Sequence, residues 1–192
     1  MKKLNRIKWL LLTAATLFLS GCAILEQKAL DSVKEVTENF TQTISNDQRI
    51  PAEFVRHIDG DTTVLRLDGK EQKVRFLLVD TPETVKTNTK VQAYGLEASK
   101  RTKELLSTAS EITFEYDKGD KADRYGRALG YIFLDGTLLQ KTLVSEGLAR
   151  VAYIKEPNTK YLLELEEAQE KAKNVSLGIW SIPGYVTTSG FK

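Results

Sequence analysis

The sequence predicts an α+β fold in which a five-stranded Greek-key barrel is capped by three helices. Three observations support this prediction. Three β segments over residues 50–79 are separated by Asp-Gly turns. A helical stripe and two further strands follow, and two more helices complete the pattern. This order suits the OB-fold architecture, which often binds oligonucleotides.

The first half of the predicted barrel is a three-stranded meander. Residues 53–58 and 62–67 have β composition, and Asp59-Gly60-Asp61 makes the turn between them. Asp68-Gly69 makes a second turn, and residues 71–79 form the third strand. His57, the only histidine, lies on the first strand with no other histidine or cysteine near it, so we expect a structural role for it.

The remaining elements follow from apolar periodicity. We expect helices over residues 94–109, 138–147 and 160–173, and strands over residues 111–116 and 128–134. The second helix should end at Gly147, a usual C-terminal signal. Together these elements form one compact domain over residues 50–181. Residues 182–192 contain Gly and Pro with little pattern, so we expect a disordered tail.

The N-terminus is typical of an exported protein. Residues 1–8 carry four basic residues and no acid, and an apolar run that is short for a membrane span follows. Leu19-Ser20-Gly21-Cys22 resembles a bacterial lipobox, which implies cleavage of residues 1–21 and a diacylglycerol group on the Cys22 thiol. The alternatives are an ordinary signal peptide or an uncleaved anchor. Residues 22–49 carry one helical stripe, which suggests a stalk or a partner helix.

The charge balance excludes a basic protein that holds nucleic acid by bulk charge. The chain has 28 basic and 26 acidic residues, and loss of the four basic residues of the signal leaves a net charge of −2. A polyanion must therefore be held by a local patch. Cys22 is the only cysteine, so no disulfide forms within the chain.

Three short clusters carry the candidate chemistry. They are Asp59-Gly60-Asp61-Thr62, Arg75 with Asp80-Thr81-Pro82-Glu83, and the charged segment 117–127. Each alone has a structural explanation, namely a turn, a helix N-cap and a solvated loop. Together they supply a complete set of groups for phosphodiester hydrolysis.

Each group in the set has a role that its chemistry suits. A hard cation such as Ca²⁺ prefers oxygen ligands, which Asp61, Asp80 and the Thr81 carbonyl offer. Such a cation neutralises phosphate charge and orients the attacking water. Glu83 is the candidate to accept the proton of that water. The remaining groups can contact the phosphate: Arg75 and Arg127 bidentately, and Tyr125 through its hydroxyl.

The domain resembles the staphylococcal nuclease family from about Pro51 to Trp180. The matching motifs are IDGDT at 58–62, RFLLVDTPET at 75–84, YG-EAS at 94–99, FEYDKG at 114–119, D-YGR at 123–127 and GLA-VAY at 147–153. The resemblance implies an OB-fold and Ca²⁺-dependent cleavage of DNA and RNA that leaves 3′-phosphates. It also implies calcium ligands at Asp61, Asp80 and the Thr81 carbonyl, and catalytic roles for Arg75, Glu83 and Arg127.

The chain departs from the family pattern where the substrate is held. Arg124 stands where the family often has lysine, and the positive charge is kept. Tyr153 can stack on a base, but Lys155 replaces the second tyrosine that usually follows, so one aromatic wall of the nucleotide pocket is in question. The loop 85–92 has only two lysines, and fewer phosphate contacts would weaken binding.

The sequence therefore predicts a monomeric Ca²⁺-dependent nuclease that is lipid-anchored outside the cytoplasmic membrane. DNA and RNA are the expected substrates, with single-stranded or frayed regions favoured. The main alternative is a nucleic-acid-binding surface lipoprotein without catalysis, and a second is a structural envelope lipoprotein. A pure binder has no need for the full set of acids and arginines, and the structural alternative leaves that set unexplained.

Overall fold

The computed structural model describes residues 28, 30, 32–34, 49–84 and 90–192. The chain divides into two units, Met1–Asp47 and Gln48–Lys192. In the first unit the described residues are helical. The predicted signal, Cys22 and most of the predicted stalk lie outside the described residues. Within the described part of the chain, no helix has the length and apolar character needed to cross a membrane.

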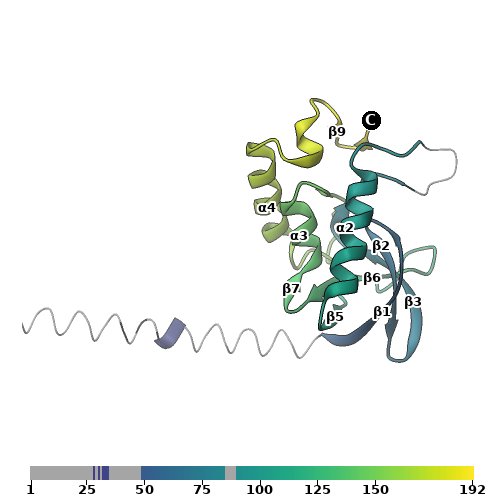
Figure 1. Ribbon diagram of the computed structural model, residues 1–192. Helices are drawn as coiled ribbons and strands as arrows, with labels where there is room; N and C mark the ends of the chain where they lie inside the picture. The colour runs from purple at the N-terminus through teal and green to yellow at the C-terminus, as the bar shows by residue number, and fades with distance from the viewer. Residues whose placement is uncertain (1–27, 29, 31, 35–48, 85–89) are drawn as a thin grey trace, which may run out of the picture. The chain divides into compact units, whose positions relative to one another are not determined.

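The second unit contains a closed five-stranded barrel (Figure 1). Antiparallel pairing joins the strands in the order β3, β2, β1, β5, β6, and a parallel pairing of β3 with β6 closes the barrel. This confirms the predicted OB-fold. The strands are β1 (Ile50–Asp59), β2 (Thr62–Leu67), β3 (Lys70–Phe76), β5 (Ile112–Glu115) and β6 (Ala128–Leu134).

The third strand is shorter than the sequence predicts. The pattern favours one strand to Val79, but β3 ends at Phe76 and Leu78 has a left-handed backbone with φ 65°. Leu78 is buried, so its apolar character serves the core and not a continuing strand. Arg75 Nη1 donates to the carbonyls of Phe76 and Val79, both at 2.9 Å, and so holds the turn closed. The chain then enters the short strand β4 (Val79–Asp80), which pairs with β8 (Arg150–Val151).

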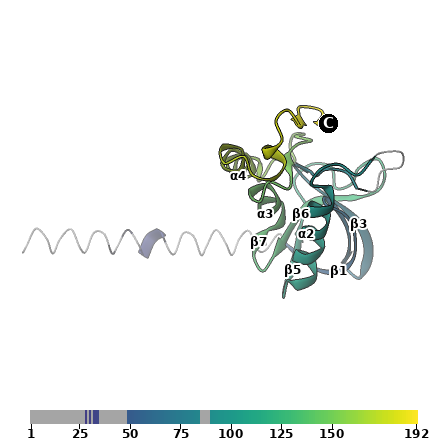
Figure 2. The ribbon, with the colours of Figure 1, turned by 45° about the horizontal axis from the view of Figure 1, so that its top comes forward.

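Three helices lie beside the barrel, as predicted. In Figures 1 and 2, α3 lies between α2 and α4. On α2, buried Ala98, Thr102 and Leu106 recur at helical spacing, and on α4 Leu165, Ala168 and Ala172 do the same. The helices are α2 (Gly95–Thr108), α3 (Leu139–Ser145) and α4 (Leu162–Asn174), with the short strand β7 (Thr137–Leu138) before α3 and a 3₁₀ turn η1 (Gly178–Ser181) after α4.

The last residues differ from the expected disordered tail. They form a hairpin of β9 (Val186–Thr187) and β10 (Gly190–Phe191), in which Phe191 pairs with Val186. Tyr185 precedes the hairpin and is buried, and its hydroxyl donates to the Ala93 carbonyl at 2.7 Å. The segment is ordered by tertiary contacts of this kind, which its weak local pattern does not reveal.

A buried carboxylate joins the barrel to the start of α4. The Glu115 side chain on β5 is fully buried. It accepts hydrogen bonds from Lys160 Nζ, from the Tyr161 hydroxyl at 2.9 Å and from Arg49 Nε at 3.4 Å. Burial raises the pKa of Tyr161, and the hydrogen bond to Glu115 adds to this rise. Removing any one partner of such a buried charge lowers the stability of the fold, because the charge is then incompletely compensated.

We therefore predict that Tyr161→Phe lowers the free energy of unfolding by about 1.5–3 kcal/mol, because it removes one donor to a buried charge. The aromatic ring and its edge contact with Tyr131 stay in place. Tyr185→Phe is the matched control, since it removes one hydroxyl bonded to a neutral carbonyl and should cost about 0.5–1.5 kcal/mol. Urea unfolding measures both values. A smaller loss for Tyr161→Phe than for Tyr185→Phe would contradict the role assigned to Glu115.

Candidate active site

Two acidic residues from distant parts of the barrel meet at one arginine. Asp61 lies in the turn between β1 and β2, and Asp80 ends β4. Arg75 Nη2 lies 2.9 Å from Asp61 Oδ2 and 3.9 Å from Asp80 Oδ1. The side chains are only 11–13% exposed. The pairing of Thr62 with Arg75 across β2 and β3 produces this meeting, because it sets the first turn beside the arginine.

Arg150 completes this cluster, and the sequence analysis did not identify it. Its Nε and Nη2 atoms both lie 2.9 Å from Asp80 Oδ2. Burial raises the pKa of the Asp80 carboxyl; Arg150 opposes the rise, Asp61 adds to it and Arg75 opposes it. The signal in the sequence is one arginine within the apolar motif GLARVAY, where a buried charge needs an acidic partner.

Asp59 is a second residue that the sequence analysis gave no separate role. Its Oδ1 accepts hydrogen bonds from the Gly60 N–H at 2.8 Å and the Thr84 hydroxyl at 2.6 Å. Its Oδ2 lies 3.4 Å from the Thr84 N–H. Asp59 therefore ties the turn that carries Asp61 to the segment that follows Asp80.

Gly60 permits a close approach between these two segments. A Cβ atom at this position would lie 2.5 Å from Thr81 Oγ1 and 2.9 Å from Thr81 Cβ. Thr81 is buried, and its N–H lies 3.4 Å from Asp61 Oδ2. The absence of a side chain at residue 60 thus places Thr81 against the Asp61 carboxylate.

Glu83 is held through its backbone. Its N–H donates to the Gln92 side-chain oxygen at 2.7 Å, and its carbonyl accepts the Gln92 N–H at 3.1 Å. Glu83 is half-buried. Most of the predicted lysine-poor loop 85–92 lies outside the described residues, which resume at Lys90. The two ends of that loop are therefore joined at Glu83 and Gln92.

Arg127 stands next to the strand pairing that closes the barrel. It directly precedes β6, two residues before Leu129, which pairs with Arg75. Asp123 orients Arg127 by accepting from its N–H at 2.9 Å and from its Nε at 2.7 Å. Burial acts to raise the pKa of Asp123, but these hydrogen bonds outweigh it and the pKa is lowered.

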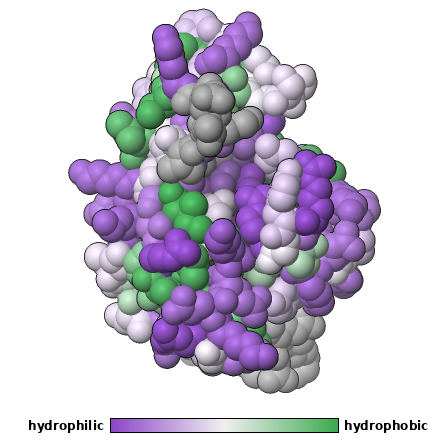
Figure 3. Space-filling model, turned by 90° about the vertical axis from the view of Figure 1, so that its right-hand side faces the viewer, coloured by the Kyte–Doolittle hydropathy of each residue, from purple (hydrophilic) through white to green (hydrophobic). Residues whose placement is uncertain are grey.

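The predicted substrate-binding residues are more exposed. Tyr125 is 69% exposed, and its hydroxyl accepts a hydrogen bond from Arg124 at 2.8 Å. The guanidinium groups of Arg124 and Arg127 lie 4.8 and 5.7 Å from the centre of its ring. In Figures 1 and 2 the segment before β6 and the segment after β4 project on the same side of the barrel. Figure 3 looks onto that side, and hydrophilic residues cover most of it.

Tyr153 joins the acidic cluster, and Lys155 does not. The Tyr153 hydroxyl lies 3.5 Å from Asp80 Oδ1, and the Arg75 guanidinium lies 5.2 Å from the centre of its ring. Lys155 is exposed and pairs with Asp120 at 2.7 Å. Lys155, which departs from the family pattern, thus forms an ion pair at the surface.

The donor set fits a hard cation. Among the described residues no group of three or more His, Cys, Asp or Glu side chains is placed to hold a metal ion. The cluster at Arg75 brings together two carboxylates, those of Asp61 and Asp80. Ca²⁺ completes its coordination with carbonyl oxygens and water, and these two carboxylates carry oxygen only. The His57 side chain is bound elsewhere: its Nε2 lies 3.0 Å from the Ser99 hydroxyl of α2, as the structural role expected from the sequence requires.

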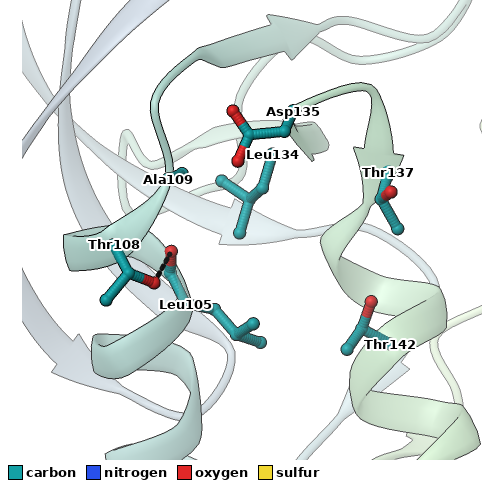
Figure 4. Close-up of a pocket in the computed structure, with 7 residues that line it drawn as sticks. All are labelled: Leu105, Thr108, Ala109, Leu134, Asp135, Thr137 and Thr142. Carbon is teal, nitrogen blue, oxygen red and sulfur yellow. Dashed lines mark hydrogen bonds between the residues drawn. The ribbon is translucent and has the colours of Figure 1, made fainter.

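One pocket lies away from this cluster, between α2 and the β7–α3 segment (Figure 4). It is lined by Leu105 and Thr108 of α2, by Ala109 directly after that helix, and by Leu134, Thr137 and Thr142, with Asp135 as its charged residue. The Asp135 carboxylate accepts hydrogen bonds from the Ser110 and Glu111 N–H groups. The pocket thus has a mixed lining of apolar and threonine side chains and one carboxylate engaged by backbone, and we assign it no chemistry.

The fold and the cluster define an OB-fold domain with a paired-carboxylate and arginine site. The family model described as "Staphylococcal nuclease homologue" matches residues 73–182. The chain belongs to this family. It is 54% identical over 136 residues to endonuclease YncB of Bacillus subtilis (strain 168), and this match covers 71% of the chain and 64% of that protein.

Two further relatives support the assignment. The chain is 52% identical over 136 residues to the SPbeta prophage-derived endonuclease YokF of Bacillus subtilis (strain 168), a match that covers 71% of the chain and 46% of that protein. It is 46% identical over 138 residues to the thermonuclease of Staphylococcus hyicus, covering 72% of the chain and 80% of that protein. The matches to the two Bacillus proteins cover less than two thirds of their lengths.

The contact between Gly60 and Thr81 gives a testable prediction. Gly60→Ala should lower the free energy of unfolding by about 1–3 kcal/mol, because the new methyl group overlaps Thr81. Thr81→Ala removes Oγ1 and Cγ2, two of the three Thr81 atoms that the new methyl group would overlap. The double variant should therefore be more stable, by at least about 0.5 kcal/mol, than the sum of the two single effects predicts. Urea unfolding of the four proteins measures this coupling. Gly126→Ala, where a Cβ meets open space, is the control and should show no coupling with Thr81→Ala.

Proposed function

We propose that the protein is a Ca²⁺-dependent endonuclease that hydrolyses DNA and RNA to 3′-phosphate products. The observation that carries the proposal is the convergence of Asp61 and Asp80 on Arg75, since two carboxylates and an arginine together serve a cation and a phosphate. Membership of the nuclease family, and relatives named as endonucleases and as a thermonuclease, support cleavage of nucleic acid.

Arg75 and Arg127 are the groups that bind the scissile phosphate. A planar guanidinium donates two parallel hydrogen bonds to phosphate oxygens. In the structure Arg75 engages Asp61 and Arg127 engages Asp123, so each arginine is held ready by a carboxylate. Their positive charges oppose the negative charge that develops on the phosphate oxygens in the transition state.

Glu83 is the residue proposed to accept the proton of the attacking water. As the water oxygen bonds to phosphorus, the bond from phosphorus to the 5′ oxygen breaks, and that oxygen takes up a proton to give a 5′-hydroxyl. The phosphate remains on the 3′ side. Asp61, Asp80 and the Thr81 carbonyl would hold Ca²⁺, which when bound neutralises phosphate charge and orients the water.

Arg124, Tyr125 and Tyr153 are the groups proposed to hold the substrate around the scissile bond. Tyr125 and Tyr153 are exposed, as groups that meet a polymer from solvent must be. Tyr153 offers a ring for stacking on a base, and Arg124 adds a positive charge beside the Tyr125 hydroxyl. A single-stranded or frayed substrate presents unstacked bases to such groups, so we expect it to be preferred.

We predict that the full chain cleaves single-stranded DNA with Ca²⁺ and not with a chelator. Arg127→Ala should lower kcat about 10²–10³-fold, as loss of a preorganised transition-state donor does. Glu83→Gln should lower it about 10²–10⁴-fold, as loss of a general base does. Gel assays of product formation measure both, and end-group analysis tests for the 3′-phosphate. Lys173→Gln on α4, whose amine pairs with Glu170, is the control and should keep full activity.

The outcomes separate this proposal from its alternative. Folded protein that binds DNA and does not cut it with any divalent metal would overturn the enzyme and favour a nucleic-acid-binding surface lipoprotein. If Glu83→Gln cleaves DNA at an unchanged rate, the proposed nuclease activity stands and the proposed role of Glu83 as the general base is wrong.

We also propose that the protein is tethered outside the cytoplasmic membrane through a lipid on Cys22, as a monomer. The lipobox sequence at 19–22 supports this, and the location has physical sense because free calcium is plentiful outside cells. Cys22→Ala should remove the lipid and shift the protein from the membrane fraction, or block processing of the precursor. Immunoblots of membrane and medium fractions measure both effects. A Cys22→Ala protein that is processed and fractionates like the parent would contradict the lipid anchor.

A further inference from the structure

The β9–β10 hairpin is anchored next to the candidate active site. The Tyr185 ring is buried and lies 5.4 Å from the Phe191 ring, measured between ring centres. The Tyr185 hydroxyl donates to the carbonyl of Ala93, directly after Gln92. The hairpin thus rests on the segment that leads from the Glu83 loop into α2.

The first contact from the hairpin reaches Glu83 through Gln92. Gln92 Nε2 donates to the Phe191 carbonyl at 3.3 Å, and Gln92 Oε1 accepts the Glu83 N–H at 2.7 Å. One amide side chain therefore joins β10 to the backbone of the proposed base.

The second contact reaches Asp80 through Arg150. Arg150 Nη1 lies 3.5 Å from the Thr188 carbonyl, and its guanidinium lies 5.7 Å from the centre of the Phe191 ring. The same side chain binds Asp80 Oδ2 with two nitrogens at 2.9 Å. The other carboxylate oxygen, Asp80 Oδ1, is not bound by Arg150. Arg75 Nη2 lies 3.9 Å from it and the Tyr153 hydroxyl lies 3.5 Å from it.

We propose that the β9–β10 hairpin is a positioning element for catalysis, which holds Asp80 through Arg150 and Glu83 through Gln92. The inference rests on the proposed function, because it assumes that Asp80 and Glu83 act as metal ligand and base. Arg150 fixes one Asp80 oxygen so that the other is presented to the cation, and Gln92 fixes the backbone that carries the Glu83 carboxylate. Partners that orient metal ligands typically change metal affinity or activity about 10–100-fold when they are lost.

A purely structural hairpin would behave differently. If its only role were to cover the barrel, its loss would lower stability and leave the properties of the folded site unchanged. A positioning role requires that the folded protein bind Ca²⁺ more weakly and turn over more slowly. Substrate binding should be less affected, because of the proposed substrate groups only Tyr153 contacts Asp80, while Arg124, Tyr125 and Arg127 lie in the segment between β5 and β6.

The test uses Phe191→Ala and Arg150→Lys in the full chain, both of which keep the net charge. Leu163→Ala on α4 is the control, since Leu163 is 71% exposed and lies outside the site. The Ca²⁺ dissociation constant is measured by calorimetry, and kcat and KM on single-stranded DNA are measured separately. Hydrogen exchange of the Glu83 amide in metal-free protein is followed by NMR.

We expect both variants to bind Ca²⁺ about 10-fold more weakly and to lose about 10-fold or more in kcat, with KM changed less than about twofold. Phe191→Ala should also speed exchange of the Glu83 amide about 10-fold, because the Gln92 contact loosens. Leu163→Ala should match the parent in every measurement.

The inference is overturned if folded Phe191→Ala matches the parent within twofold in Ca²⁺ affinity, kcat and Glu83 exchange. If Phe191→Ala does not fold, Arg150→Lys decides, and unchanged Ca²⁺ affinity in that variant overturns the inference. If the parent neither binds Ca²⁺ nor cleaves DNA, the proposed function fails. Glu83 amide exchange in the metal-free variants then still decides whether the hairpin holds that segment.

Discussion

The parallel pairing of β3 with β6 is the constraint on which the rest of the site depends. It closes the barrel, and it places Arg75 opposite Leu129, two residues after Arg127. The antiparallel pairing of β3 with β2 brings the turn that carries Asp61 to the same arginine. If β3 slipped by one residue against β2, the Arg75 side chain would point to the opposite face of the sheet and lose its contact with both acidic residues. The OB-fold therefore fixes the relative positions of groups that lie far apart in the sequence.

Charge balance explains how the acidic cluster is tolerated at low exposure. Asp61 and Asp80 carry two negative charges, and Arg75 and Arg150 carry two positive charges, all on side chains 10–13% exposed. A buried ion pair contributes little net stability, because desolvation cancels most of the attraction. Removal of one partner is costly, since it leaves a charge unpaired. The cluster is thus better explained by the geometry it imposes than by stability it adds.

Much of the fold followed from the sequence, and the failures have a common physical cause. The turns at Asp59-Gly60 and Asp68-Gly69 and the strand at 128–134 depend on local composition, so they were predictable. The turn at Leu78 was not, because four buried apolar residues in a row, Phe76 to Val79, look like one strand whether or not the chain turns. Arg150 was missed for a related reason: its partner, Asp80, lies 70 positions away, and only the pairing of β4 with β8 joins them.

The site separates into two zones with different tolerance to change. Groups proposed to act on the reacting atoms, such as Arg75 and Asp80, are nearly buried and bound to one another. Groups proposed to hold the polymer, such as Tyr125 and Tyr153, are 68–69% exposed. Replacement of an exposed group alters few internal contacts, as Lys155 illustrates with its surface partner Asp120. A substitution in the outer zone can therefore leave the contacts of the inner zone intact, because the strand pairings of the barrel constrain the inner zone.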